Sequence, residues 1–329
     1  MPRPGAFTPS PLLVTILRVL PLLVLLALAI VAMLLGFLLK RPAPKTTRRL
    51  VVCVVNVGHG EAAWVRTPGG RIVLIGGGPP GAGKLVNASL RKSDARRIDL
   101  LILPYPYAEA IGGLPEVLAR FPVTGGAWES GYPPPTPIAP NGMTSAAAGQ
   151  TEPINEWQEK VWNLLRESDV PIQHVRAGQR FDLGDGVRVE VLAPDAPLVA
   201  AYPAAPNNSV VTRITFGETA FLFAGGLERA GETALLARAA AAGGDDESLR
   251  AAWLRIARFG SREATSPEFL RRVRPEFAVI SVGATNSSGY PHRETLGRLP
   301  AAGATVLRID QARGDLIFES DGARVRKVN

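Results

Sequence analysis

The hydrophobic positions along the chain fall into two patterns that meet near residue 50. Residues 19–39 are 21 consecutive residues without a charge, mostly Leu, Ala, Val and Ile. At about 1.5 Å of rise per residue, such a helix spans a bilayer core of about 30 Å. The run has no polar face, which argues against a buried helix of a soluble protein. The pattern predicts a single transmembrane helix at 19–39, after a tail at 1–18 and before a linker at 40–49.

A cleaved signal peptide is the competing interpretation of this run. Its apolar region has about 7–15 residues and is followed by a small-x-small cleavage site. Here the run is longer and ends in Leu38-Leu39-Lys40-Arg41, which does not resemble a cleavage site. We therefore expect the helix to be retained.

From residue 50 the pattern changes to short apolar runs separated by Gly and Pro turns, with amphipathic segments between them. Strands are predicted at 50–56, 62–67, 71–75, 99–103, 172–176, 187–192, 209–216, 219–225, 253–257, 277–282, 304–309 and 314–319. Helices are predicted at 85–92, 111–120, 154–167, 228–241, 266–273 and 293–299, and a long loop at 131–151. This mixture of hairpins and βα units predicts a layered α/β sandwich, formed as one domain by residues 50–329.

Charge is concentrated in the short segment before this domain. The chain of 329 residues has a net charge of +8, and residues 1–49 hold seven basic side chains and no acidic ones. Removing those seven leaves +1 for residues 50–329, which does not indicate a general nucleic-acid-binding surface. The single cysteine excludes a disulfide framework, and three histidines are few for a His-rich metal centre. The abundance of Ala, Arg, Gly and Pro is typical of a bacterial protein from a GC-rich genome.

The basic residues near the apolar run also bear on orientation. Five Lys/Arg follow the predicted helix at 40–49, whereas only Arg3 and Arg18 precede it. The positive-inside rule then favours a cytoplasmic domain. The segment 40–49 is either a simple stop-transfer flank or a contact with anionic lipid head groups.

Several motifs, in order and with matching spacing, resemble the metallo-β-lactamase fold, and in particular the soluble domain of the competence protein ComEC and its stand-alone relatives. Residues 56–62 read N-V-G-H-G-E-A where that family has D-V-G-Q-G-D-A. Residues 67–70 read T-P-G-G, as in the family, and residues 104–115 read P-Y-P-Y-A-E-A-I-G-G-L-P in place of T-H-P-H-A-D-H-I-G-G-L-P. The resemblance implies an αββα sandwich over residues 50–320 or so.

The departures from the family pattern fall on the metal ligands that the resemblance implies. In the family, His and Asp side chains hold two divalent metals, which activate water and bind an oxyanion. The matching positions here are Tyr105, Tyr107, Glu109, Ala110, Gly226, Arg258, Phe259 and Tyr290. Only Glu109 keeps a similar ligand, and one carboxylate does not hold a catalytic zinc pair. The resemblance therefore implies a pseudoenzyme with no catalytic residues, no metal and no cofactor.

A rewired site is the alternative. The polar residues that would lie near the former cleft are His59, Glu61, Glu109, Arg258 and His292. They are either a replacement ligand set or ordinary polar residues at the rim of an inactive cleft, and we favour the second interpretation because a metal site needs several converging ligands. Arg258 either binds an anion or pairs with Glu109 in place of the metals.

Other residues in the motifs have plainer interpretations. Tyr105 and Tyr107 either stack on a ligand ring or fill the space of the metals, and we favour filling. Ser261 is expected to cap a turn rather than act as a nucleophile, because no His or Lys partner is visible for it. Trp157 and Trp162 on the predicted helix 154–167 either pack in the core or mark a partner surface.

Three hypotheses of function remain open at this stage. The first is a single-pass membrane protein with a catalytically degenerate domain, which acts as an accessory subunit bound to a membrane protein partner. The second is a metal-dependent hydrolase or nuclease of the ComEC type with a rewired site. The third is a DNA-uptake-associated binding protein, which the near-neutral domain does not favour. Contact with membrane lipid is expected through residues 19–39. The side of the membrane stays open, because ComEC implies an extracytoplasmic domain whereas the flanking charges favour the cytoplasm.

Overall fold

The computed structural model describes residues 49–132, 156–241, 243 and 247–329, together with Leu20, Leu28 and Ile30. The predicted transmembrane helix at 19–39 lies outside the described residues except for those three. The same holds for the tail at 1–18, for the linker at 40–49 apart from Arg49, and for most of the loop predicted at 131–151. Among the residues that are described, no helix is long and apolar enough to cross a membrane.

Eight strands of the described chain form the first sheet, in the order β15-β14-β1-β2-β3-β4-β5-β6. The strands are β1 (Leu50–Val54), β2 (Ala62–Arg66), β3 (Ile72–Gly76), β4 (Leu100–Ile102), β5 (Ala127–Glu129), β6 (Ile172–His174), β14 (Leu316–Ser320) and β15 (Val325–Lys327). β1 lies antiparallel between β14 and β2, and Leu50 pairs with Ser320. From β3 to β6 the strands run parallel.

Seven strands form the second sheet within the same described ranges, in the order β13-β12-β11-β10-β9-β8-β7. The strands are β7 (Arg180–Gly184), β8 (Val187–Ala193), β9 (Val211–Phe216), β10 (Thr219–Phe223), β11 (Trp253–Arg255), β12 (Phe277–Ile280) and β13 (Thr305–Arg308). β7, β8, β9 and β10 form an antiparallel meander, and β10 to β13 run parallel.

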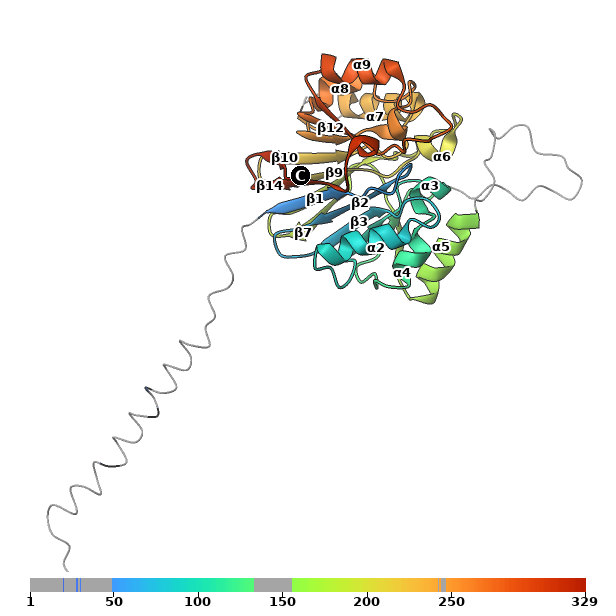
Figure 1. Cartoon of the computed structure of the whole chain (residues 1–329). Coiled ribbons are helices and arrows are strands. Elements are labelled where there is room, and N and C mark those ends of the chain that lie inside the picture. Colours follow the sequence, from blue (N-terminus) through green and yellow to red (C-terminus); the bar gives the residue numbers. More distant parts are fainter. Residues whose placement is uncertain are drawn as a thin grey trace, which may run out of the picture. The chain divides into compact units, whose positions relative to one another are not determined.

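Helices cover the outer face of each sheet. The helices of the described chain are α2 (Gly83–Lys92), α3 (Ala108–Ile111), α4 (Leu114–Leu118), α5 (Glu156–Glu167), α6 (Ala204–Asn207), α7 (Arg229–Ala241), α8 (Pro267–Val273) and α9 (Arg293–Ala301), with short 3₁₀ turns at η1 (Ala257–Gly260) and η2 (Ile309–Gln311). Figure 1 shows α2, α4 and α5 on the side of the first sheet and α7, α8 and α9 on the side of the second. The predicted α/β sandwich of two sheets flanked by helices is therefore present.

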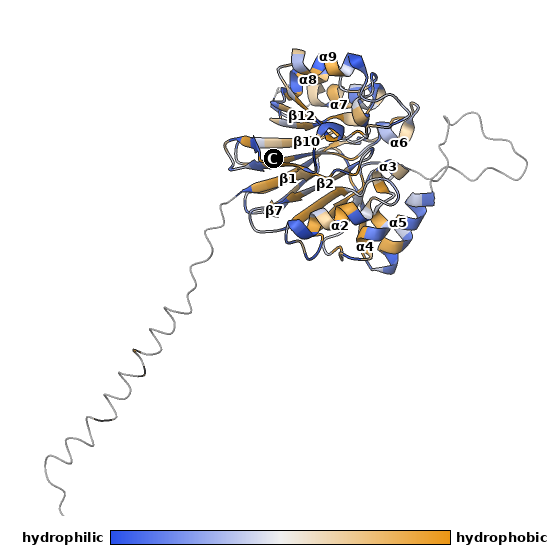
Figure 2. Cartoon of the chain, viewed as in Figure 1, coloured by the Kyte–Doolittle hydropathy of each residue, from blue (hydrophilic) through white to orange (hydrophobic). Residues whose placement is uncertain are grey.

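The apolar core has three layers that follow from this arrangement. Val52, Phe221 and Trp253 are among the residues buried between the two sheets. Leu90 of α2 and Leu235 of α7 belong to the layers that lie under the helices of the first and second sheets. Figure 2 shows the same division, with hydrophobic colour along the strands and hydrophilic colour on outward helix faces. Burial of these faces is the main favourable contribution to folding.

The two ends of the sandwich differ, and we name them from the parallel strands. The carboxyl end is where β3 to β6 and β10 to β13 finish, and the amino end is where these strands and β1 begin. Glu61, before β2, hydrogen-bonds to Arg255 at the end of β11, so the parallel strands of both sheets finish at the same end. In Figure 1, α3 and α6 mark the carboxyl end, and the start of β1 and the end of β14 mark the amino end.

A few short elements differ from the sequence prediction. The structure adds β5, β7, β15, α6 and α3, and only α4 lies within the predicted helix 111–120, because Gly112 and Gly113 separate it from α3. β5 and β15 have three residues each, which is too short for a periodic signal. β7 lies at the edge of its sheet with only intermediate or exposed residues, so its apolar alternation is weak.

Candidate functional site

The loops that follow strands at the carboxyl end bring all the predicted site positions into one region. Their sources are the loop after β1, which carries His59 and Glu61, the loop and helix after β4, the loop after β10, the η1 turn and the loop after β12. In sheets with parallel strands, this end is the usual location of ligand sites. The structure therefore gathers residues that are more than two hundred positions apart in the sequence.

A buried ion pair joins the two sheets at the base of this region. Arg255 Nη1 donates to Glu61 Oε1 at 2.7 Å, and each side chain is only 3% exposed. The other guanidinium nitrogens donate to the carbonyl of Gly60 at 3.3 Å and to the hydroxyl of Ser281 at 3.2 Å. The space around this pair leaves no volume for a water molecule. Because a buried charge must be paired and hydrogen-bonded, each partner holds the other in place.

Arg255 was not among the residues predicted from the sequence, although one signal for it was present. Arg255 ends the short strand Trp253–Arg255, in which every residue is buried. An arginine in an otherwise apolar buried strand indicates a fixed acidic partner, because arginine is almost never fully buried without one. The sequence did not show which acidic residue is the partner, because Glu61 lies 194 positions away.

A second arginine occupies the position between the loops, closer to solvent. Arg258 Nη1 donates to Glu109 Oε1 at 3.1 Å, so of the two alternatives given for Arg258 the pairing with Glu109 is present. Arg258 Nε lies 3.7 Å from Glu228 Oε1, and the guanidinium carbon lies 5.3 Å from the ring centroid of Tyr107. The three charged side chains are 16–24% exposed. One cation is thus held by two carboxylates and an aromatic ring.

The charges around Arg258 perturb its neighbours. Burial raises the pKa of Glu109, and the nearby Arg258 only partly opposes this effect. Burial disfavours the charged form of Arg258, but Tyr105, Glu109 and Glu228 raise its pKa above the usual range. Arg258 is therefore a permanent cation at the centre of the region.

The backbone of the η1 turn directs Arg258 inward. Arg258, Phe259 and Gly260 have φ values of 46°, 55° and 86°, in the left-handed region. A left-handed conformation costs a non-glycine residue of order 1–3 kcal/mol and persists only where its surroundings fix it. The Arg258 amide donates to the carbonyl of Gly225 at 3.0 Å. Gly260 is required for space as well, since a Cβ there would lie 2.6 Å from Pro291.

Tyr105 fills the interior next to Gly226. The tyrosine side chain is 1% exposed and contacts Tyr107 edge-on at 5.7 Å between ring centroids. A Cβ at Gly226 would lie 3.0 Å from two ring carbons of Tyr105, so the two residues are matched in size. Burial, with Glu61 and Glu109 nearby, raises the pKa of Tyr105 well above its usual value. Its hydroxyl has no hydrogen-bond partner among the described residues.

His59 lies in an aromatic cluster rather than among acidic groups. Its ring centroid is 4.1 Å from that of Phe259 and 6.1 Å from that of Tyr290, which in turn meets His292 edge-on at 5.1 Å. Burial lowers the pKa of His59, and Arg258 and Arg255 lower it further. The imidazole is therefore held neutral. Its buried Nδ1 has no hydrogen-bond partner in the described parts of the chain.

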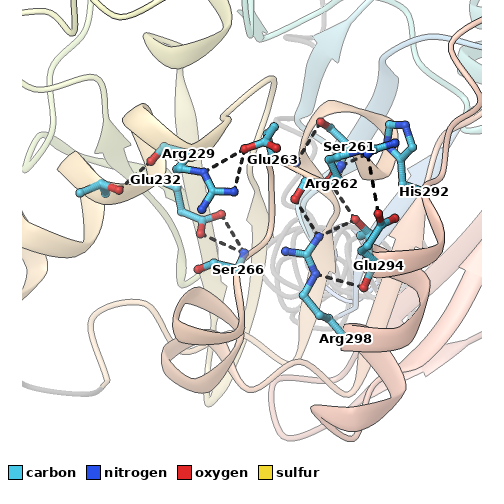
Figure 3. Close-up of polar contacts among 11 residues, drawn as sticks. Arg229, Glu232, Ser261, Arg262, Glu263, Ser266, His292, Glu294 and Arg298 are labelled. Carbon is cyan, nitrogen blue, oxygen red and sulfur yellow. Dashed lines mark hydrogen bonds and ion pairs between the residues drawn. The ribbon is translucent and has the colours of Figure 1, made fainter.

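His292 connects two loops at the rim. Figure 3 shows its ring beside Arg262, whose amide donates to His292 Nδ1 at 3.1 Å. The amide of His292 donates to the carbonyl of Gly260 at 3.0 Å, so the residue fixes the turn that follows Arg258. Ser261 is 4% exposed, and its hydroxyl accepts from the Glu263 amide at 3.2 Å. Ser261 thus stabilises a turn, the role expected from the sequence.

These contacts do not fit a divalent metal centre. Within the described ranges, no three His, Cys, Asp or Glu side chains converge as a ligand set. Glu61 is bound by Arg255, and Glu109 and Glu228 flank Arg258. Ala110 is fully buried, and its carbonyl accepts from the Gly77 amide at 2.7 Å. A divalent cation would have to displace a guanidinium from the same carboxylates, so the geometry favours salt bridges over metal ligation.

Comparisons of the sequence with known proteins identify competence proteins as relatives. The chain is 27% identical over 278 residues to ComE operon protein 3 of Bacillus subtilis, which covers 79% of this chain and 32% of that protein. It is 26% identical over 280 residues to competence protein ComA of Neisseria gonorrhoeae, with 85% and 34% covered. The chain thus matches about a third of the length of these relatives. No protein-family profile matches it. The similarity to competence proteins confirms the predicted resemblance to the ComEC-type domain.

The solved structures that match this chain have low sequence identity and TM-scores below 0.5. A variant of CmlA beta-hydroxylase is 14% identical, with a TM-score of 0.48 and coverage of 88% of this chain and 55% of that one. A diphosphatase of the PhnP family is 16% identical, with a TM-score of 0.44 and coverage of 82% and 98%. The Rm3 metallo-beta-lactamase is 14% identical, with a TM-score of 0.35 and coverage of 61% and 76%.

Proposed function

We propose that this ComEC-like chain is a membrane-anchored protein whose metallo-β-lactamase-like domain acts by binding rather than by metal catalysis, as an accessory subunit of a membrane complex. The observation that carries the proposal is the position of Arg258, which donates to Glu109 and lies beside Glu228. In a ComEC-type site the metals would require these loops to present anionic or neutral ligands. Here the loops hold a permanent cation instead.

The size of the side chains supports the same conclusion. Tyr105 occupies the space beside Gly226, where the family pattern has a ligand aspartate. A Cβ at 226 would lie 3.0 Å from the ring of Tyr105, so a side chain there would require that ring to shift. Such complementary packing stabilises the scaffold without the metals. A preserved scaffold with a filled centre favours a role in binding.

The membrane part of the proposal rests on the sequence. Residues 19–39 are long and apolar enough to cross the bilayer, and the basic residues at 40–49 follow directly. The partner that fits such an anchored domain is a membrane protein in the same bilayer. Purification from native membranes in mild detergent, with the chain tagged, tests this arrangement. We expect a membrane protein to co-purify in a stoichiometric amount. A chain that elutes alone, even after crosslinking in cells, would contradict this arrangement.

Metal content tests the loss of catalysis. We would incubate the full-length protein in detergent with zinc and manganese, desalt it and measure bound metal by elemental analysis. Fewer than about 0.1 metal ions per chain are expected. The measurement is informative because zinc that a protein holds normally survives such handling. Arg258→His is compared with the natural chain in the same measurement, because it replaces the cation with a side chain that can bind metal. One or two tightly held ions in the natural chain, lost in Glu109→Gln, would overturn the proposal.

A rewired hydrolase or nuclease is the second candidate, and one observation favours it. His59 is held neutral, and its Nδ1 is buried without a partner among the described residues. Both properties are expected of a nitrogen that would bind a metal. If metal is retained, the His59→Ala variant distinguishes the candidates. Loss of metal and of phosphodiesterase activity on DNA in this variant would establish the rewired site.

A further inference from the structure

A polar groove with an excess of arginines lies at the amino end of the sandwich, opposite the filled site. Its volume is about 600 Å³, and five of its lining residues are Arg213, Arg250, Arg274, Arg324 and Arg326. Three glutamates, Glu218, Glu247 and Glu276, also line it. Five positive and three negative side chains leave a net charge of +2 within the groove. The region around Arg255 and Arg258 contrasts with this, because each of those arginines faces carboxylates directly.

The arginines of the groove differ in how they are held. Arg250 forms an ion pair with Glu247 at 2.8 Å, and Arg213 Nε donates to the Arg250 carbonyl at 2.8 Å. Arg324 and Arg326 are exposed on the hairpin that joins β14 and β15. The Arg324 amide donates to Asp321 Oδ1 at 2.9 Å, and Arg326 helps to lower the pKa of the Asp321 carboxyl, but among the described residues neither guanidinium forms a hydrogen bond or a close ion pair. These two side chains are the ones best placed to bind an external anion.

The groove lies at the end of the domain where the preceding chain attaches. Leu50, the first residue of β1, pairs with Ser320, the last residue of β14. Arg49 forms an ion pair with Glu319 of the same strand. The Glu218 amide donates to the Gly322 carbonyl at 2.6 Å, which holds the tip of the β14–β15 hairpin against the second sheet. The hairpin arginines are therefore next to the point at which residues 40–49 join the domain.

The length of that connection limits the distance to the membrane. A linker of ten residues, 40–49, spans at most roughly 35 Å when fully extended. The attraction of an anionic leaflet decays within about 8 Å at physiological ionic strength. The tether thus permits contact between the amino end and the bilayer but does not enforce it. Positive charge on that end is what would orient the domain.

We infer that the groove and the β14–β15 hairpin bind the phosphate head groups of anionic lipids, and that this contact seats the amino end of the domain on the membrane. The inference rests on the proposed membrane anchor. Guanidinium groups suit phosphate oxygens because they donate two parallel hydrogen bonds. In this orientation the carboxyl end, with Arg258 and His59, points away from the bilayer toward a partner.

Site-specific fluorescence on the full-length protein in nanodiscs tests the orientation. The native thiol does not interfere, because Cys53 is fully buried and burial raises its pKa far above the usual value. One label is placed at Ala323→Cys, an exposed position in the lining of the groove, and a control label at Ser287→Cys on the exposed loop after β12. A lipid with a quencher in its head group reports proximity to the membrane. Stronger quenching at 323 than at 287 is expected in discs that contain phosphatidylglycerol, with loss of the difference in high salt.

Charge reversal supplies the matched controls. Arg324→Glu changes the net charge by the same amount as Arg293→Glu, which lies at the exposed start of α9 at the carboxyl end. Arg324→Glu is expected to abolish most of the excess quenching at 323, whereas Arg293→Glu leaves it intact. Equal effects of the two variants would show that total charge rather than the groove is responsible, and would overturn the inference.

The remaining outcomes separate this inference from the proposed anchor. If the protein does not co-elute with nanodiscs, the membrane anchor fails and the inference fails with it. If it co-elutes but position 323 is quenched no more than 287, or equally in neutral phosphatidylcholine discs, the anchor stands and the lipid contact is overturned. Salt-dependent binding of a short DNA duplex, lost in Arg324→Glu and accompanied by no lipid effect, would assign the groove to nucleic acid instead.

Discussion

Two arginine–glutamate pairs lie near each other at the carboxyl end and differ mainly in depth. Arg255 and Glu61 are each 3% exposed, and their contact joins the two sheets. Arg258 and Glu109 are 17% and 24% exposed, and their contact joins loops above that junction. The deeper pair has the shorter hydrogen bond, 2.7 Å against 3.1 Å. The comparison indicates that the deep pair maintains the sandwich, whereas the shallow pair lies closer to solvent and remains accessible to a ligand.

The largest difference is expected when each arginine is removed. Arg255→Ala leaves Glu61 buried and unpaired, which costs about 3–5 kcal/mol of unfolding free energy. Arg258→Ala leaves carboxylates that water reaches, at a cost of about 1 kcal/mol. Chemical denaturation of the full-length protein in detergent, followed by tryptophan fluorescence, measures both. Similar losses in the two variants would show that depth does not distinguish the pairs.

A double variant sharpens the result for the deep pair. Glu61→Met combined with Arg255→Met removes both charges and fills a similar volume. Replacing a buried ion pair with apolar residues is often neutral or stabilising, so this variant should recover most of the loss. If it is as unstable as Arg255→Ala, the hydrogen bonds to Gly60 and Ser281 matter more than the charges.

Restoring the family residue at 226 tests the filling of the site. Gly226→Asp places a side chain against the ring of Tyr105, and we expect a loss of about 1–3 kcal/mol from overpacking. Tyr105→His in the same chain makes room and should recover part of this loss. Gly297→Asp is the control, because a Cβ there meets nothing within 4 Å. Equal unfolding free energies for Gly226→Asp and Gly297→Asp would contradict the packing argument.

The shallow pair predicts a dependence on pH. Burial raises the pKa of Glu109 above its ordinary value of 4.5, and Arg258 opposes this effect. A carboxyl with a raised folded-state pKa contributes stability below pH 4.5, and that contribution is lost as the pH rises through the raised value. Glu109→Gln should flatten the profile of unfolding free energy in this window. In Arg258→Ala the loss of stability should extend to higher pH, because the guanidinium no longer lowers the pKa of Glu109. A profile that neither variant changes would show that Glu109 does not cause the pH dependence.

The smallest expected effect is on His59. Its pKa is lowered from 6.5 by burial and by the two arginines. Its contribution to stability is therefore present above pH 6.5 and is lost as the pH falls through the lowered value. In Arg258→Ala, the imidazole resonances of His59, followed by NMR in detergent, should titrate at higher pH than in the natural chain. A pKa that stays the same would show that burial accounts for the whole shift.

The sequence predicted most of the architecture, because the strands and helices with clear periodicity carry most of the core. The buried runs at β1, β3 and β10 and the amphipathic α5 are of this kind. Elements without such a signal were missed, such as the three-residue β5 and the edge strand β7. The split between α3 and α4 depends on close backbone approach at Gly112 and Gly113, which periodicity does not report.

The candidate site divides in the same way. The motif pattern predicted Tyr105, Gly226 and Arg258 as replaced positions, because each stands at a fixed place in a recognisable turn, and this remains a prediction. It did not identify Arg255, and it did not show that Tyr105 and Gly226 pack against each other. Such relations join residues more than a hundred positions apart, and local sequence carries no distance between them.

The sequence by itself determined the two-sheet class of the domain and the apolar run at 19–39, and it predicted that the family's ligand residues are replaced, because periodicity and turn motifs are local properties of the chain. Only the tertiary structure decided which side chains meet at those positions. The folding of two sheets face to face brings Glu61 to Arg255 and Glu109 to Arg258. It also separates a filled carboxyl end from an arginine-lined amino end, because strand direction and strand order in the sheets determine which loops meet.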